Sequence, residues 1–152
     1  MLLETVFEYR TLIGKCDLGV GLEWDEIEAM TRIEHSFASN TGDGRRYRRQ
    51  AIELVAMMRG DQINDRVQLI EMGPGGCVAI NAPFIANGEL IELVIDHGEE
   101  SYRFVARGVW LREDGADYRV GLRFVGMPVR LHKVQISPHK QDVVDKINSA
   151  AA

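Results

Sequence analysis

Four arginines stand close together in residues 45–49, which read Arg-Arg-Tyr-Arg-Arg. The whole chain of 152 residues has a formal net charge of −5, so this basic cluster differs from its surroundings. A guanidinium group offers a planar fork of donors that fits a phosphate or the Hoogsteen edge of a guanine, and its flat face can stack on a base. The cluster therefore indicates a nucleotide or another phosphate ligand. The alternative is a solvated basic turn that pairs with some of the 23 acidic residues.

A second stretch that could take part in binding is the glycine-rich segment 71–76, Glu-Met-Gly-Pro-Gly-Gly. Three glycines in four positions indicate a backbone that needs positive φ or that another group approaches closely. With Glu71 beside them, backbone N–H donors and one carboxylate acceptor would meet a ligand at the same rim. The alternative is a plain glycine-rich hairpin turn.

The composition excludes several classes of protein. With 45% hydrophobic and 27% charged residues, the chain can bury a core and is globular rather than disordered. No apolar run approaches the roughly 20 residues of a membrane span, and Glu4, Glu8 and Arg10 interrupt the N-terminus where a signal peptide would be apolar. We therefore expect a cytoplasmic protein. One basic cluster falls short of the stripe that a duplex backbone requires, which argues against general nucleic-acid binding.

Metal binding and catalysis have little support in the sequence. Cys16 and Cys77 are far apart and have no second Cys or His at ligand spacing, so neither a zinc site nor a disulfide is indicated. The four histidines are scattered, and no nucleophile, base and orienting group fall in one segment. The sequence thus predicts a binding protein rather than an enzyme, without a metal or a cofactor.

The first forty residues are predicted to form an extension. Residues 4–13 are rich in β-branched and aromatic types and predict a strand. Residues 23–38 predict an amphipathic helix, because apolar residues recur every three or four positions and acidic residues gather in the first turns. The apolar residues assigned to its face are Trp24, Ile27, Met30, Ile33 and Phe37. That face could pack on the rest of the chain or on a second protomer, as in a homodimer.

A turn-forming run at 39–44 separates the extension, residues 1–40, from the main domain, residues 41–152. The pattern then changes to short β segments with turn residues between them. The candidate strands are 51–59, 66–72, 77–81, 90–95, 102–111 and 118–125. Because no helical segment interrupts them, the pattern favours a closed antiparallel barrel over an alternating α/β sheet. Ser137-Pro138 predicts the start of a C-terminal helix, and residues 127–136 have no clear pattern.

The ordered set of motifs resembles the PilZ domain family over about residues 44–126. An Arg-Arg-x-x-Arg run at 45–49 is followed by a strand and by an acidic-x-small-x-x-Gly loop at 71–76. Gly-Val-Trp at 108–110 and Val-Gly-Leu-Arg-Phe at 120–124 come next. The resemblance implies a mainly β fold with a six-stranded antiparallel barrel. It also implies a non-enzymatic receptor for the bacterial second messenger cyclic di-GMP, in a pathway such as motility, type IV pili, polysaccharide output or virulence.

The resemblance also assigns ligand contacts. The family's Arg-x-x-x-Arg motif falls on Arg45 and Arg49, with Arg46 and Arg48 between them, and in the family these arginines hold phosphates and guanine edges. The second motif is usually Asp or Asn, any residue, Ser, two of any residue, and Gly. Here Glu71 and Gly73 depart from it and Gly76 fits. Glutamate is longer than the usual Asp or Asn, and glycine lacks the usual serine hydroxyl. Together these changes predict that cyclic di-GMP binds about one to three orders of magnitude more weakly than to a complete motif.

Two hypotheses follow. In the first, the protein is a cyclic di-GMP receptor in which the ligand draws Arg45 and Arg49 onto the barrel and swings the extension about the linker. In the second, the barrel has lost the nucleotide and serves as an interaction module that holds an unidentified partner protein through the helix at 23–38 or through a barrel face.

Overall fold

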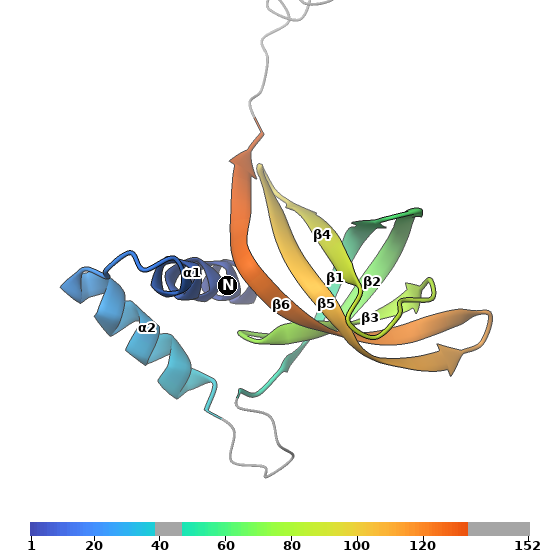
Figure 1. Cartoon of the computed structure of the whole chain (residues 1–152), viewed down its shortest axis with the longest axis horizontal. Helices are drawn as coiled ribbons and strands as arrows, with labels where there is room; N and C mark the ends of the chain where they lie inside the picture. The colour runs from blue at the N-terminus through green and yellow to red at the C-terminus, as the bar shows by residue number, and fades with distance from the viewer. Residues whose placement is uncertain (39–46, 134–152) are drawn as a thin grey trace, which may run out of the picture.

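The computed structural model describes residues 1–38 and 47–133. Two helices precede a closed six-stranded antiparallel barrel (Figure 1). The helices are α1 (Leu2–Asp17) and α2 (Trp24–Ser36). The strands are β1 (Gln50–Gly60), β2 (Ile63–Gly73), β3 (Gly76–Ala82), β4 (Leu90–His97), β5 (Glu100–Asp114) and β6 (Asp117–His132). Around the barrel their order is β1-β2-β3-β6-β5-β4, so the predicted six-stranded barrel is confirmed and every strand is longer than predicted.

Strand β6 includes residues 127–132 of the stretch 127–136, which has no clear pattern in the sequence; residues 134–136 lie outside the described residues. Arg103 of β5 pairs with Val129, whereas Val105 pairs with Val125, so β6 carries extra residues between these two pairs. Gly126, with φ of 69°, lies in this irregular stretch. A bulge shifts the alternation of inward and outward side chains, and the period of two is lost at that point. The strand nevertheless continues as far as His132.

The barrel interior is filled by inward-facing apolar side chains from all six strands. Two of its rings, Phe104 and Phe124, are stacked with centroids 4.8 Å apart. The largest fully buried strand residues are Tyr102, Phe104, Met58, Leu69, Met72, Leu93, Ile95, Leu122 and Val120. Burial of each such side chain stabilises the fold by roughly 1.5–3 kcal/mol before the entropy of ordering is counted.

The predicted strand at 4–13 is wrong, because this segment lies within helix α1. Leu3 and Val6 are buried in the barrel core, and Phe7 packs edge-to-face on Tyr102 with centroids 5.5 Å apart. Their spacing of three and four residues places them on one helix face. Burying that face against the barrel outweighs the β propensity of the individual residues.

Helix α1 lies directly on the bulge of β6 (Figure 1). The Arg10 guanidinium donates a hydrogen bond of 3.4 Å to the Gly126 carbonyl oxygen. Met127 packs against the backbone of Gly14 on the helix. Helix α1 therefore packs directly against strand β6 of the barrel.

Helix α2 confirms the helix predicted at 23–38, but its apolar residues occupy two faces instead of one. Ile33 and Phe37 are buried in a cluster with Tyr9 of α1. Trp24 and Ile27 are 82% and 40% exposed. At 100° per residue Trp24 and Ile33 lie on opposite sides of the helix, and the side of Ile33 is the one that packs within the chain.

Helix α2 begins with a capping box, in which the backbone N–H of Glu23 donates to the Glu26 carboxylate at 3.0 Å. No helix within residues 1–38 and 47–133 is long and apolar enough to cross a membrane. The predicted C-terminal helix and the predicted boundary at residue 40 lie outside the described residues, and both stay predictions.

Candidate functional site

The described part of the arginine run, residues 47–49, is fastened to the end of helix α2. The backbone N–H of Arg48 donates to the Phe37 carbonyl oxygen at 2.7 Å. The Arg48 guanidinium donates to the Ser36 carbonyl oxygen, also at 2.7 Å. Ala38 and Tyr47 form an isolated β-bridge. The chain therefore enters strand β1 from a segment that is hydrogen-bonded to the last residues of α2.

Tyr47 continues this connection to helix α1. Its hydroxyl lies 2.7 Å from that of Tyr9, and the Tyr9 hydroxyl donates to the Glu34 carboxylate at 3.1 Å. Burial, followed by the hydrogen bond to Tyr47, raises the pKa of Tyr9 far above its ordinary value, so this phenol stays protonated. The tyrosine within the Arg-Arg-Tyr-Arg-Arg run thus joins α1, α2 and the start of the barrel.

The glycine segment forms the hairpin between β2 and β3, where Gly73 pairs with Gly76. A Cβ atom at Gly73 would lie 2.5 Å from the carbonyl oxygen of Arg48, which is closer than a real Cβ contact. A Cβ atom at Gly76 would collide with the Leu122 carbonyl oxygen of β6. The glycines therefore allow two backbone segments to rest directly on this hairpin.

A hollow of about 170 Å³ lies between the arginine segment and the hairpin. Its cationic side chains are Arg48, Arg49 and Arg123, and it is also lined by the hairpin glycines Gly73, Gly75 and Gly76, of which Gly73 and Gly76 are buried. Arg123 belongs to β6, where it pairs with Gly76 of β3. Three arginine side chains around one hollow can hold an anion that also carries planar, hydrogen-bonding groups.

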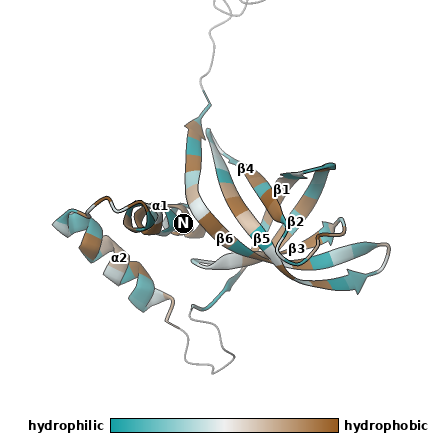
Figure 2. Cartoon of the chain, in the orientation of Figure 1, coloured by the Kyte–Doolittle hydropathy of each residue, from teal (hydrophilic) through white to brown (hydrophobic). Residues whose placement is uncertain are grey.

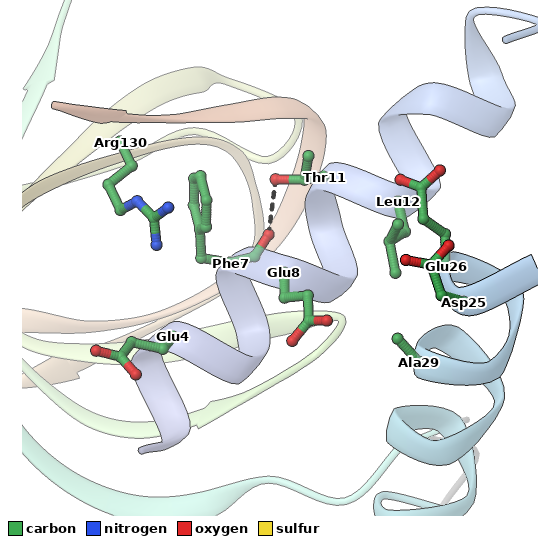
Figure 3. Close-up of a pocket in the computed structure, with 9 residues that line it drawn as sticks. All are labelled: Glu4, Phe7, Glu8, Thr11, Leu12, Asp25, Glu26, Ala29 and Arg130. Atoms are coloured by element: carbon green, nitrogen blue, oxygen red, sulfur yellow. Dashed lines mark hydrogen bonds between the residues drawn. The ribbon is translucent and has the colours of Figure 1, made fainter. Parts of the chain in front are cut away.

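A larger cleft of about 450 Å³ lies between α1 and α2 and has the opposite charge (Figure 3). Its charged side chains are Glu4, Glu8, Asp25, Glu26 and Arg130. The single guanidinium among them lies 5.0 Å from the centroid of the Phe7 ring. Four carboxylates repel a phosphate, so a nucleotide favours the smaller arginine hollow.

The tryptophan and the final glycine motif form one element of the barrel. Trp110 of β5 pairs with Gly121 of β6, and its indole lies directly over that glycine's backbone. The guanidinium of Arg112 lies 5.7 Å from the indole centroid. The motifs at 108–110 and 120–124 thus lie on the adjacent strands β5 and β6. Strand β6 places Arg123 beside the hollow.

A family model for the PilZ domain matches residues 43–136, which is well over half of the chain. This chain belongs to the PilZ domain family. PilZ domains are binding and adaptor modules of cyclic di-GMP signalling. A comparison with curated proteins finds no match to this chain.

The structure brings together part of the set that PilZ resemblance predicts from the sequence. Arg49, Gly73 and Gly76 line the hollow. Glu71 is half-buried on β2, on the same strand face as Gly73, and is not among the residues that line the hollow. Arg45 and Arg46 lie outside the described residues.

Sequence reasoning did not single out one side chain of this PilZ hollow, that of Arg123. Arg48 belongs to the arginine run that the sequence indicates as a ligand-binding cluster, and it lines the hollow. Strand alternation in residues 120–124 predicts an outward Arg123, but it does not reveal that β3 and β6 are neighbours. The Gly-x-Arg-Phe motif is the sequence signal that could have identified Arg123. Once β3 and β6 are known to be neighbours, an outward arginine in this motif lies directly across from the hairpin glycine.

Cys77 is buried on β3 next to Gly76, which lines the hollow, and its thiol is unreactive. Burial raises the pKa of its thiol to about 12, and the nearby charge of Arg49 opposes this rise only in part. Cys16 is exposed on α1, and both cysteines are free thiols. In residues 1–38 and 47–133, no three His, Cys, Asp or Glu side chains gather into a group that could hold a metal ion.

Proposed function

We propose that this PilZ protein is a cytoplasmic receptor and adaptor that binds cyclic di-GMP and passes the signal to a partner protein. The observation that carries the proposal is the convergence of Arg48, Arg49 and Arg123 on one hollow beside the glycine hairpin. The ligand has two phosphates and two guanines, and a guanidinium suits both groups. The signalling output would belong to motility, pilus function or another surface behaviour.

The proposed ligand contacts combine both PilZ motifs. Arg45, Arg46 and Arg49 would supply guanidinium groups from the first motif, and Glu71, Gly73 and Gly76 would supply the rim from the second. Arg48 and Arg123 join this set because they line the hollow. Glu71 and Gly73 depart from the usual second motif, so we propose an affinity lower than a complete motif would give.

The contacts around Arg48 offer a route for the signal. Its guanidinium is hydrogen-bonded to the Ser36 carbonyl oxygen at the end of α2. A phosphate in the hollow would attract the same guanidinium, since a charged acceptor makes the stronger hydrogen bond. Ligand binding would therefore compete with the attachment of α2, and the position of this helix would report the ligand to a partner.

A second candidate function is an interaction module that no longer binds the nucleotide. One observation favours it: the carbonyl oxygen of Arg48 lies against Gly73, where the usual motif has a serine. In this arrangement the backbone fills part of the space beside the second motif. The helices would then serve a partner protein without a ligand.

Isothermal titration calorimetry with cyclic di-GMP distinguishes the two functions. Saturable binding by the wild type that Arg49→Ala and Arg123→Ala each weaken by about tenfold or more would support the receptor. Arg59→Ala is the matched control, because Arg59 is an exposed arginine at the end of β1, away from the hollow. Absence of saturable heat up to about 100 μM ligand, equivalent to about −5.5 kcal/mol, would favour the interaction module.

A further inference from the structure

The outward side of helix α2 carries a stripe of side chains that nothing in the described chain covers. Trp24, Ile27, Thr31 and His35 follow one another at spacings of three and four residues, and all four are exposed. They lie on the side opposite Ile33 and Phe37, which pack toward α1. In Figure 2 hydrophobic positions recur along α2, which lies beyond α1 from the barrel.

This stripe is hollowed and largely apolar. A shallow groove of about 540 Å³ runs along the helix between Trp24 at one end and His35 at the other. The indole at its head is 82% exposed. An exposed tryptophan can serve as the anchor of an interface, and the apolar groove beside it can receive the anchor of another molecule.

The charges beside the groove run from acidic to basic along the helix. Glu28 lines its N-terminal half, and Arg32 lines its C-terminal half. Neither Glu28 nor Arg32 makes an ion pair within residues 1–38 and 47–133. Both charges are therefore available to another molecule.

We propose that the occupant of this face is α2 of a second copy of the chain, packed antiparallel about a two-fold axis. Antiparallel packing places Glu28 of each copy beside Arg32 of the other, on the same flank of the interface. It also places Trp24 of each copy over the Thr31 and His35 end of the other groove. In a parallel two-fold pair, Glu28 and Arg32 of one copy would lie on the opposite flank from those of the other, so only the antiparallel arrangement pairs these two residues across the interface.

The size of this surface sets the strength of the association. Helix α2 has 13 residues and is thus about 20 Å long. One short helix from each copy makes an interface at the small end of the range for specific complexes. The dimer therefore dissociates in the range of roughly 1–100 μM.

Sedimentation velocity of the full chain from about 1 to about 500 μM tests this interface, because that range brackets the expected dissociation constant. The wild type is expected to change from monomer to dimer. Trp24→Ala is expected to weaken the dimer roughly 30-fold or more, since the anchor is lost twice in a two-fold interface. Phe84→Ala is the matched control, because Phe84 is an exposed aromatic residue of the barrel, 58% exposed, and far from α2 in the chain.

A charge exchange tests the antiparallel order itself. Glu28→Arg alone and Arg32→Glu alone each place like charges together, and each is expected to weaken the dimer about tenfold or more. The double variant Glu28→Arg/Arg32→Glu restores opposite charges across the interface and is expected to recover the wild-type dimer. Circular dichroism confirms that α2 stays helical in each variant. A wild type that stays monomeric, a Trp24→Ala variant that associates normally, or a double variant that stays monomeric would each overturn the proposal.

Discussion

The carbonyl oxygen of Arg48 lies against Gly73, only 2.5 Å from where a Cβ atom on that glycine would be. The arginine segment and the second PilZ motif are therefore in direct backbone contact. The absence of a side chain at position 73 permits this contact, and the usual serine of the motif would prevent it without a shift of the backbone. The glycine that departs from the motif is thus what allows the arginine segment to lie against the hairpin.

Substitution of this glycine is expected to release the arginine segment. Gly73→Ser should lower the free energy of unfolding by about 1–3 kcal/mol, as overpacking does, and should speed hydrogen exchange of the Arg48 amide. Gly75→Ala is the matched control in the same hairpin, because nothing lies within 4 Å of an added Cβ atom there. Equal stability and equal exchange in both variants would show that residues 48 and 73 are not in contact in solution.

The two tyrosine hydroxyls at 2.7 Å are expected to act as a unit. Tyr9→Phe and Tyr47→Phe should each destabilise the fold by about 0.5–1.5 kcal/mol, and the double variant should cost less than the sum of the two. Urea denaturation of the four proteins of this cycle measures the coupling. Tyr118→Phe removes a hydroxyl that has no hydrogen bond in the described residues, so it should have little effect. Additive losses at Tyr9 and Tyr47 would contradict a shared network.

Helix α1 is expected to fold together with the barrel, because Leu3 is buried in the barrel core. Leu3→Ala should lower the free energy of unfolding by about 2–5 kcal/mol through lost burial and a residual cavity. Leu18→Ala, just after the same helix, should change it by less than about 0.5 kcal/mol because that side chain is 72% exposed. Chemical denaturation followed by circular dichroism gives both values. A Leu3→Ala variant as stable as the control would mean that the helix is detached from the barrel.

The pKa of His132 is expected to lie above its ordinary value of 6.5. Its ring nitrogen lies 3.0 Å from the Glu100 carboxylate, and this hydrogen bond favours the charged imidazolium. Because the folded-state pKa is the higher one, the pair stabilises the fold below about pH 6.5, and the stabilisation is lost as the pH rises through the folded-state value. A titration followed by NMR should show Glu100→Gln lowering the pKa of His132 more than Glu99→Gln does. The reverse order would contradict the pairing.

The barrel could be predicted from the sequence because its physical signal is local. Alternating apolar residues and turn residues recur through the six strands, and each hairpin follows from its own segment. The bulge at Gly126 interrupts that alternation, so the sequence pattern does not predict the part of β6 that follows it. Helix α1 was mistaken for a strand because its β-branched and aromatic residues dominate the local propensity. Its helical conformation is determined by contacts such as Phe7 with Tyr102, which are distant in the sequence.

The candidate site was predictable only in part for the same reason. Arg49, Gly73 and Gly76 belong to motifs that can be read from neighbouring residues. Arg123 faces the hollow because β6 pairs with β3, and this pairing is a property of the closed barrel. Likewise, the periodicity of α2 marks Trp24 and Ile33 as apolar helix residues but does not say that only the second packs within the chain.

The most direct test of the central claim is a titration of the ¹⁵N-labelled protein with cyclic di-GMP, followed by two-dimensional NMR. The account predicts saturable shifts of the amides that border the arginine hollow, namely those of Arg48, Arg49, Gly73, Gly75, Gly76 and Arg123. It also predicts smaller shifts at Ser36 and Phe37, which are hydrogen-bonded to the arginine segment. No shifts at these amides at millimolar ligand, or shifts confined to the acidic cleft between α1 and α2, would contradict it.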